Sequence, residues 1–113
     1  MVANPKKHEA ALNQILRALA DGTRRDILAR ALTGAHSVSE LAARYDMSFA
    51  AVQKHVAVLE RAGLVQKQAS GREQRVSTNH ARLKRVGELL DHFESIWRQR
   101  LAQLDDVLMR KGS

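Results

Sequence analysis

The chain contains no cysteine in its 113 residues, which excludes disulfides, thiolate metal sites and thiol nucleophiles. Aromatic residues are scarce at 4%, so a core must be built from Leu, Val, Ile and Ala. No apolar run approaches the length of a membrane span, and the opening MVANPKKHEA has no apolar stretch typical of signal peptides. With 44% apolar residues the chain can form a modest core, and we expect one cytoplasmic domain over residues 1–113.

Patterns typical of catalysis are lacking as well. The sequence has no glycine-rich phosphate loop and no nucleophile–base arrangement. It also has no pair of carboxylates within a motif that would position them for catalysis. The five histidines are scattered without the spacing of metal ligands. We therefore expect no cofactor, no metal and no enzymatic activity. A site joining His92 to Asp91 or Glu94 of a second chain is a less favoured alternative.

Positive charge is in excess and unevenly distributed. The net charge of +7 favours a polyanionic partner. Residues 54–85 carry +6 of this charge, with only Glu60 and Glu73 on the acidic side. Their basic residues are Lys54, Arg61, Lys67, Arg72, Arg75, Arg82, Lys84 and Arg85. A surplus concentrated on one segment indicates a nucleic-acid surface more strongly than a basic chain does.

Residues 38–62 have the pattern of two short helices joined by a tight turn. Ser37 and Glu40 form an S-x-x-E capping box, in which each side chain bonds a free backbone N–H of the other residue. Ser48 is placed to cap the second helix, and Gly63 follows it where a left-handed residue ends a helix. This arrangement is the helix-turn-helix that lays its second helix in the DNA major groove.

The second helix of this unit has two distinct faces. Val52, Val56 and Leu59 form one stripe at helical spacing, which we expect to be buried. Upstream, Asp21 is a good cap for a helix over 22–32, where two adjacent arginines, Arg24 and Arg25, either support the helix or touch phosphates.

Residues 64–78 read as a β-hairpin that follows the helix-turn-helix. Ser70-Gly71 is a turn signal, and residues 74–78 form a plausible return strand. A hairpin in this place is a wing, which would offer Arg72 at its tip and Arg75 on its return strand to phosphates or the minor groove. The chain as a whole is therefore predicted to be mainly α with a small β-hairpin.

Two longer helices flank this unit, over about residues 5–20 and 80–110. The second spans about 45 Å at 1.5 Å per residue, more than so small a domain can cover. Its apolar residues recur at nearly heptad spacing, which predicts a partner chain and, most simply, a homodimer. The expected interface residues are Leu12, Ile15, Leu16, Leu19, Leu90, Phe93, Trp97, Leu101, Leu104 and Leu108.

Three segments together resemble the ArsR family of bacterial winged-helix repressors: ALADGTRRDIL, SVSELAARYDMSFAAVQKHVAVLERAGLV and the basic turn SGREQR. The likeness runs from about Ile15 to Thr78, and it implies a dimeric winged helix-turn-helix repressor. The family's Cys-x-Cys metal pair has Ala42 and Arg44 in its place, and Thr78 replaces the aspartate of its zinc-binding branch. The resemblance therefore implies no metal site.

Several residues are predicted to meet DNA. Gln53 is suited to reading an adenine edge, and Lys54 to binding a phosphate. Phe49 either touches a thymine methyl group or folds back onto Tyr45. The full expected set is Ser37, Ser48, Phe49, Ala50, Gln53, Lys54, His55, Lys67, Arg72 and Arg75.

These features predict a sequence-specific DNA-binding regulator of transcription. We expect a homodimeric repressor on an inverted repeat, with half-sites about 10 bp apart, that also acts at its own promoter. Two alternatives stay open. One is a metal- or small-molecule-responsive sensor with its site at the dimer interface, and the other is a winged-helix module that binds RNA or protein. The sequence specifies no effector ligand.

Overall fold

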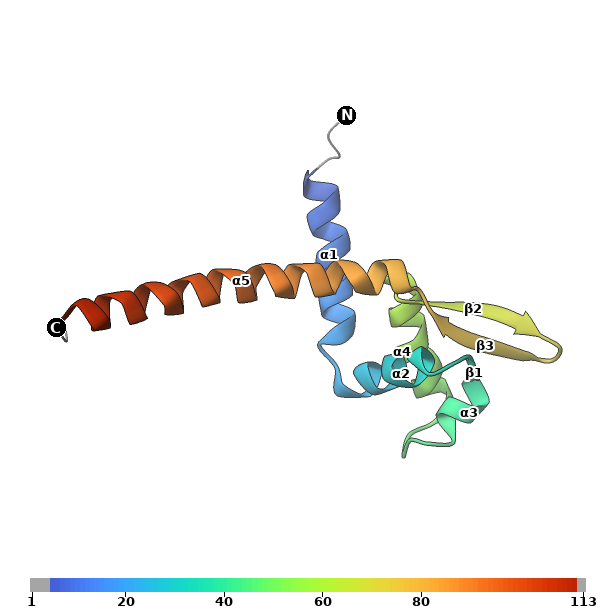
Figure 1. The fold of residues 1–113 in the computed structure, drawn as a ribbon. Helices are drawn as coiled ribbons and strands as arrows, with labels where there is room; N and C mark the ends of the chain where they lie inside the picture. The colour runs from blue at the N-terminus through green and yellow to red at the C-terminus, as the bar shows by residue number, and fades with distance from the viewer. Residues whose placement is uncertain (1–4, 112–113) are drawn as a thin grey trace. The chain divides into compact units, whose positions relative to one another are not determined.

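A computed structural model of the chain describes residues 5–111. The elements follow one another as α1 (Pro5–Leu19), α2 (Gly22–Leu32), β1 (His36–Ser37), α3 (Val38–Ala42), α4 (Phe49–Arg61), β2 (Val65–Ser70), β3 (Glu73–Thr78) and α5 (His80–Lys111) (Figure 1). The predicted mainly helical architecture with a small antiparallel hairpin is confirmed. None of the described helices combines the length and apolar character that crossing a membrane requires.

The chain forms two contact units, with the boundary after Leu83. The first contains α1 to α4, the sheet and the first residues of α5. The second is the remainder of α5, from Lys84 onward. The residues predicted to face DNA all belong to the first unit.

Side chains cap three helices of the first unit, as the sequence predicts. Asp21 Oδ1 accepts the backbone N–H three residues on at 3.0 Å, and this bond is the main reason that the pKa of Asp21 lies below its ordinary 3.8. Ser37 Oγ and Ser48 Oγ accept the equivalent N–H groups at 3.0 and 3.1 Å. Each bond satisfies a backbone donor that a helix start leaves free, so these three residues set where α2, α3 and α4 begin.

Gly63 ends α4 in the left-handed conformation, with φ of 77°. Its N–H donates to the Glu60 carbonyl at 2.9 Å, and the Leu64 N–H donates to the Leu59 carbonyl at 3.0 Å. These two bonds form a Schellman motif, which closes the helix and turns the chain into β2. The predicted role of this glycine is confirmed.

The sheet has three antiparallel strands in the order β1-β3-β2. Val65 pairs with Thr78 and Ser70 with Glu73, so β2 and β3 form the wing, residues 65–78, with its turn at Gly71. Strand β1 was not predicted, because two residues are too short to show alternation. It places the start of α3 against β3.

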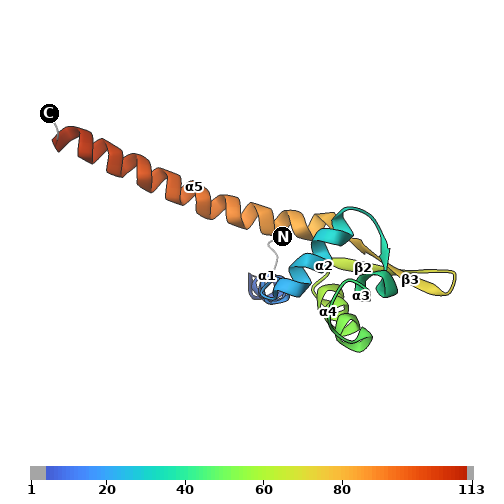
Figure 2. The same cartoon turned by 90° about the horizontal axis from the view of Figure 1, so that it is seen from below.

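Aliphatic side chains fill the core of the first unit, where α4 contacts α2, α3 and β2, and α3 lies beside β3 (Figure 2). The predicted stripe of α4 is buried, with each of its residues 0% exposed. The largest buried apolar side chains are Ile15, Ile27, Leu41, Val52, Val56, Leu59, Leu64 and Val76. Burying such a side chain contributes about 1.5–3 kcal/mol, so this cluster fixes α4 against its neighbours.

Helix α5 has a long row of exposed apolar side chains. The large ones, between 42% and 78% exposed, are Leu90, Phe93, Ile96, Trp97, Leu101, Leu104, Val107, Leu108 and Met109. Large apolar surfaces of this kind on a soluble chain mark interaction sites.

Candidate nucleic-acid interface

Helix α4 presents a second face opposite its buried stripe. Phe49, Ala50, Gln53 and Lys54 are all exposed on it. Phe49 and Gln53 are one helical turn apart and therefore point in similar directions, as do Ala50 and Lys54. The face combines an aromatic ring, an amide and an ammonium group, which suit contacts with a thymine methyl, a base edge and a phosphate.

A groove of about 340 Å³ joins this face to the wing. Its lining comes from β1, α3, α4 and the hairpin, and consists of Ser37, Val38, Ser39, Phe49, Gln53, Arg72, Glu73 and Gln74. Four of the predicted DNA-facing residues thus meet at one concave surface although they are up to 35 positions apart in the sequence: Ser37, Phe49, Gln53 and Arg72. We call this surface the α4–wing groove.

The groove also contains residues that the sequence did not indicate. Ser39 lies in the first turn of α3, and Gln74 lies on β3. Neither position carries a local signal, because their place in the groove depends on the packing of α3 against α4 and on the pairing of the hairpin strands. Both side chains can hydrogen-bond to bases or phosphates.

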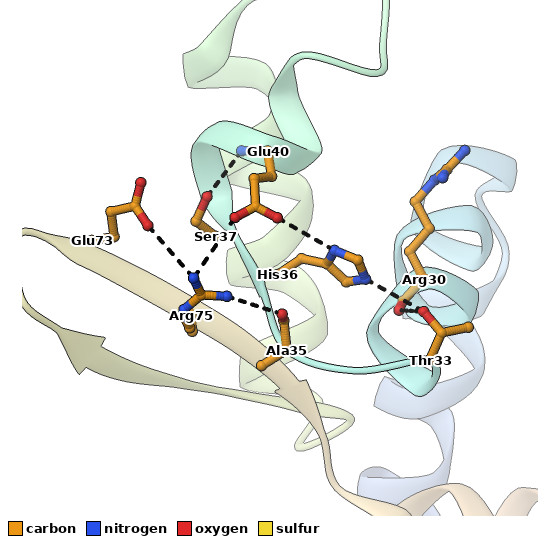
Figure 3. Close-up of polar contacts among 8 residues, drawn as sticks. All are labelled: Arg30, Thr33, Ala35, His36, Ser37, Glu40, Glu73 and Arg75. Atoms are coloured by element: carbon orange, nitrogen blue, oxygen red, sulfur yellow. Dashed lines mark hydrogen bonds and ion pairs between the residues drawn. The ribbon is translucent and has the colours of Figure 1, made fainter.

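A network of polar contacts lies at the base of the wing (Figure 3). The Arg75 guanidinium donates to the Ala35 carbonyl at 3.2 Å and lies 3.9 Å from the Glu40 carboxylate and 4.0 Å from that of Glu73. Glu40 in turn is 3.6 Å from His36 Nδ1. Arg75, which the sequence predicts at the DNA, therefore has protein partners, and its side chain holds β3 against the segment that leads into α3.

The side chains of Ser37 and Glu40 have different partners. Ser37 is only 1% exposed and its hydroxyl caps α3, so this hydroxyl is engaged within the protein. The Glu40 carboxylate pairs with His36 and Arg75 instead of turning back to the Ser37 N–H. Only one arm of the predicted capping box is therefore formed, because stronger charged partners compete for the other.

Other predicted contacts also have protein partners. Lys67 Nζ is 3.5 Å from the Glu60 carboxylate, and the Ser48 hydroxyl caps α4. His55 is half-buried, with Nδ1 3.4 Å from the Arg24 guanidinium. Arg24 and Arg25 both donate to the carbonyls that end α1.

The turn between α3 and α4 is anchored to α2 by Tyr45, whose hydroxyl donates to the Asp26 carboxylate. This bond and a second from Arg30 hold the pKa of Asp26 below its ordinary value, while burial and the Asp26 contact raise that of Tyr45. Because Tyr45 is engaged here and Phe49 lines the groove at 47% exposure, the structure favours the exposed alternative for Phe49.

Nothing in residues 5–111 points to a metal centre, since no three His, Asp or Glu side chains there come together in a way that could hold an ion. Two ion pairs of the first unit, Lys67–Glu60 and Arg75–Glu40, link helices to the wing.

Comparisons place the chain among transcriptional regulators. A family model described as a helix-turn-helix domain matches residues 19–68. A crystal structure of an ArsR family transcriptional regulator is 33% identical, with a TM-score of 0.72, over 87% of this chain and 97% of that one. An ArsR-like transcriptional regulator from Rhodococcus sp. RHA1 has the same identity and TM-score, over 89% and 95%.

A more distant similarity is to the solution structure of a homodimeric winged helix-turn-helix DNA-binding domain from Mycobacterium bovis. It is 23% identical, with a TM-score of 0.62, over 84% of this chain and 91% of that one. No curated protein matches the chain.

Proposed function

The chain belongs to the ArsR family of DNA-binding transcriptional regulators, and from this premise we propose that it is a homodimeric repressor of an inverted-repeat operator. The observation that carries the proposal is the α4–wing groove. It combines the exposed face of α4 with Arg72 of the wing tip on one surface. A repressor follows most simply, because a dimer that occupies a promoter blocks access to it.

In the proposed complex α4 lies in the major groove. Gln53 reads a base edge, because its amide both donates and accepts, and Lys54 binds a neighbouring phosphate. Arg72, exposed at the wing tip, reaches the backbone beside the site. Ser39 and Gln74 line the same groove and add further polar contacts.

The proposed dimer uses α5 together with α1. Leaving Phe93 and Trp97 at 59% exposure would be costly in water, and a second copy supplies the simplest cover. On α1, Leu16 is 40% exposed, whereas Ile15 is 1% exposed and already belongs to the core of the protomer. Leu16 is therefore the stronger α1 candidate for the interface. The similar domain from Mycobacterium bovis is homodimeric, which supports a dimer but not a particular interface.

A selection of bound duplexes from a random pool tests the function. We expect enriched sequences to contain two inverted half-sites whose centres lie about 10 bp apart or a multiple of that. Enriched duplex should then be compared with scrambled duplex and with RNA of the same length at one salt concentration. Equal binding to all three would contradict the proposal and favour a non-specific RNA or protein-interaction module.

A salt titration with the enriched duplex gives an independent measurement. The logarithm of the affinity should fall linearly with the logarithm of the salt concentration, with a slope of about −0.9 per phosphate neutralised. A flat response would mean that the basic surface around α4 and the wing is not what meets the DNA. A reporter placed behind the selected site then distinguishes repression from activation.

A further inference from the structure

The Arg24 side chain, which belongs to α2, contacts two other elements of the first unit. It leaves α2 and donates through Nε to the Ala18 carbonyl at 2.7 Å and through Nη2 to the Arg17 carbonyl at 3.1 Å. Its third nitrogen, Nη1, lies 3.4 Å from Nδ1 of His55, which is on α4. One guanidinium thus joins the end of α1 to the middle of the helix that carries the proposed reading face.

The chemistry of this group makes the junction stiff. The last carbonyls of a helix have no partner within the helix, and a cation is favourable at that end. Arginine offers its donors in a planar fork whose directions are fixed, whereas lysine is a point charge on a flexible stem. Because the three nitrogens of Arg24 are directed at two different helices, a change in the angle between α1 and α4 would break at least one contact.

The contact with His55 also has a defined polarity. A guanidinium has no acceptor, so Nδ1 of the ring must accept and the proton of the neutral ring must lie on Nε2. His55 is half-buried and adjoins Lys54, the proposed phosphate ligand. The contact with Arg24 therefore lies next to the proposed DNA-facing residues of α4 in the sequence.

We propose that Arg24 is a positioning residue that fixes α4 relative to α1 and thereby sets which half-site spacing the dimer accepts. This inference rests on the proposed function, in which α1 contributes to the dimer interface and each α4 enters a major groove. The distance between the two reading helices then depends on the α1–α4 angle within each protomer. Arg24 determines geometry without touching DNA.

Arg25 provides a matched control. It is the next residue of α2 and has the same charge, and its Nη1 donates to the Leu19 carbonyl at 2.7 Å. Its hydrogen-bonded partner therefore belongs to the same end of α1, while the contact with α4 is made by Arg24. Removing Arg25 loosens the end of α1 without removing the link to His55.

The experiment measures affinity for a series of operators with identical half-sites whose centre-to-centre spacing runs from about 8 to about 13 bp, bracketing one turn. The proteins are wild type, Arg24→Gln, Arg24→Lys and Arg25→Gln, each checked for folding by circular dichroism. Wild type should prefer one spacing. Arg24→Gln and Arg24→Lys should reduce that preference several-fold while the half-site sequence preference stays unchanged, and Arg25→Gln should keep the wild-type profile.

Three outcomes would overturn the inference. If Arg24→Gln weakens binding at every spacing equally and lowers the salt slope by about 1 while Arg24→Lys binds normally, Arg24 is a phosphate ligand. If Arg25→Gln flattens the profile as much as the Arg24 variants do, the effect belongs to the end of α1 in general. If wild type shows no spacing preference at all, the paired-site function itself fails. Should Arg24→Gln not fold, Arg24→Lys carries the comparison.

Discussion

Arg75 on β3 donates a hydrogen bond to the carbonyl oxygen of Ala35, 3.2 Å away, and so fastens the wing to the segment that leads into α3. Arg72, three residues earlier, is exposed and lines the α4–wing groove. Arg75 therefore contacts protein groups, whereas Arg72 is open to the groove. This difference predicts different consequences of substituting the two arginines.

Arg72→Ala should weaken binding to all duplexes similarly and lower the salt slope by about 1, since it removes one phosphate contact. Arg75→Ala should instead lower the free energy of unfolding by about 0.5–1 kcal/mol through the lost hydrogen bond to Ala35. Urea unfolding and salt-dependent binding measured on both variants separate the two effects. An Arg75→Ala protein with normal stability and a reduced salt slope would place Arg75 on the DNA after all.

Local signals in the sequence were enough to predict much of this fold. The caps at Asp21, Ser37 and Ser48 and the left-handed Gly63 follow from short-range backbone chemistry, and the structure confirms each. The buried stripe of α4 follows from helical spacing in the same way. These features depend on residues only three or four positions apart, so the sequence records them directly.

The features that were missed depend on distant residues. Strand β1 exists because His36 pairs with Val76, forty positions away. A strand of two residues is too short to show a pattern that would predict it. Ser39 and Gln74 line the groove through the packing of α3 and the pairing within the hairpin, and Glu40 contacts Arg75, 35 positions away. The link from Arg24 to His55 spans 31 positions and was equally invisible. Tertiary proximity of this kind leaves no periodic signal.

The bond from Tyr45 to Asp26 predicts a specific dependence of stability on pH. It is the largest cause of the lowered pKa of Asp26. A carboxyl with a lowered folded-state pKa contributes stability that is present above its unfolded value of 3.8 and lost as the pH falls through the folded value. Tyr45→Phe should therefore lower the free energy of unfolding at pH 7, by an amount that solvent screening keeps small because the Asp26 side chain is 47% exposed.

The same variant should lose less of its remaining stability on acidification, because the pKa of Asp26 then lies closer to its unfolded value. Urea unfolding of wild type and Tyr45→Phe between about pH 6 and about pH 2 measures the difference. Parallel curves for the two proteins would show that the hydrogen bond does not control the titration of Asp26.

Phe49 is predicted to contact a thymine methyl group, because its exposed ring lines the α4–wing groove beside Gln53. Replacing the contacted thymine of the selected operator by uracil removes only the C5-methyl group. Wild type should bind the uracil duplex several-fold more weakly, whereas Phe49→Ala should bind both duplexes equally. If the methyl group still matters to the Phe49→Ala protein, the reader of that methyl group is another residue. A thymine outside the half-sites serves as the control position.

Substitution of Trp97 can distinguish a dimer from a monomer. Its side chain is 59% exposed within the protomer, so it would be buried only in a dimer. In a monomer, Trp97→Ala would remove little buried surface and change stability slightly. In the proposed dimer, Trp97→Ala should lower the stability of the dimer by about 3 kcal/mol or more, as large-to-small changes in a packed interior do.

Sedimentation of Trp97→Ala at low micromolar concentration should therefore show single protomers. For wild type, the unfolding midpoint should rise with protein concentration. Gln99→Ala, at a polar position two residues on, should leave the dimer intact.

Gln53 and Lys54 are adjacent on α4, and both are exposed, yet they are predicted to contribute differently. Gln53→Ala should relax the sequence preference at one base pair of each half-site. The loss of binding free energy should be about 1–3 kcal/mol for the preferred operator and smaller for operators that are substituted at that base pair. Lys54→Ala should weaken binding to every operator sequence by a similar factor, because the phosphate backbone is the same in all of them. Binding of both variants to single-base-pair substitutions of the operator measures this contrast. An unchanged preference profile for Gln53→Ala would move the reading role to another residue of the groove, with Ser39 and Gln74 the first to be substituted.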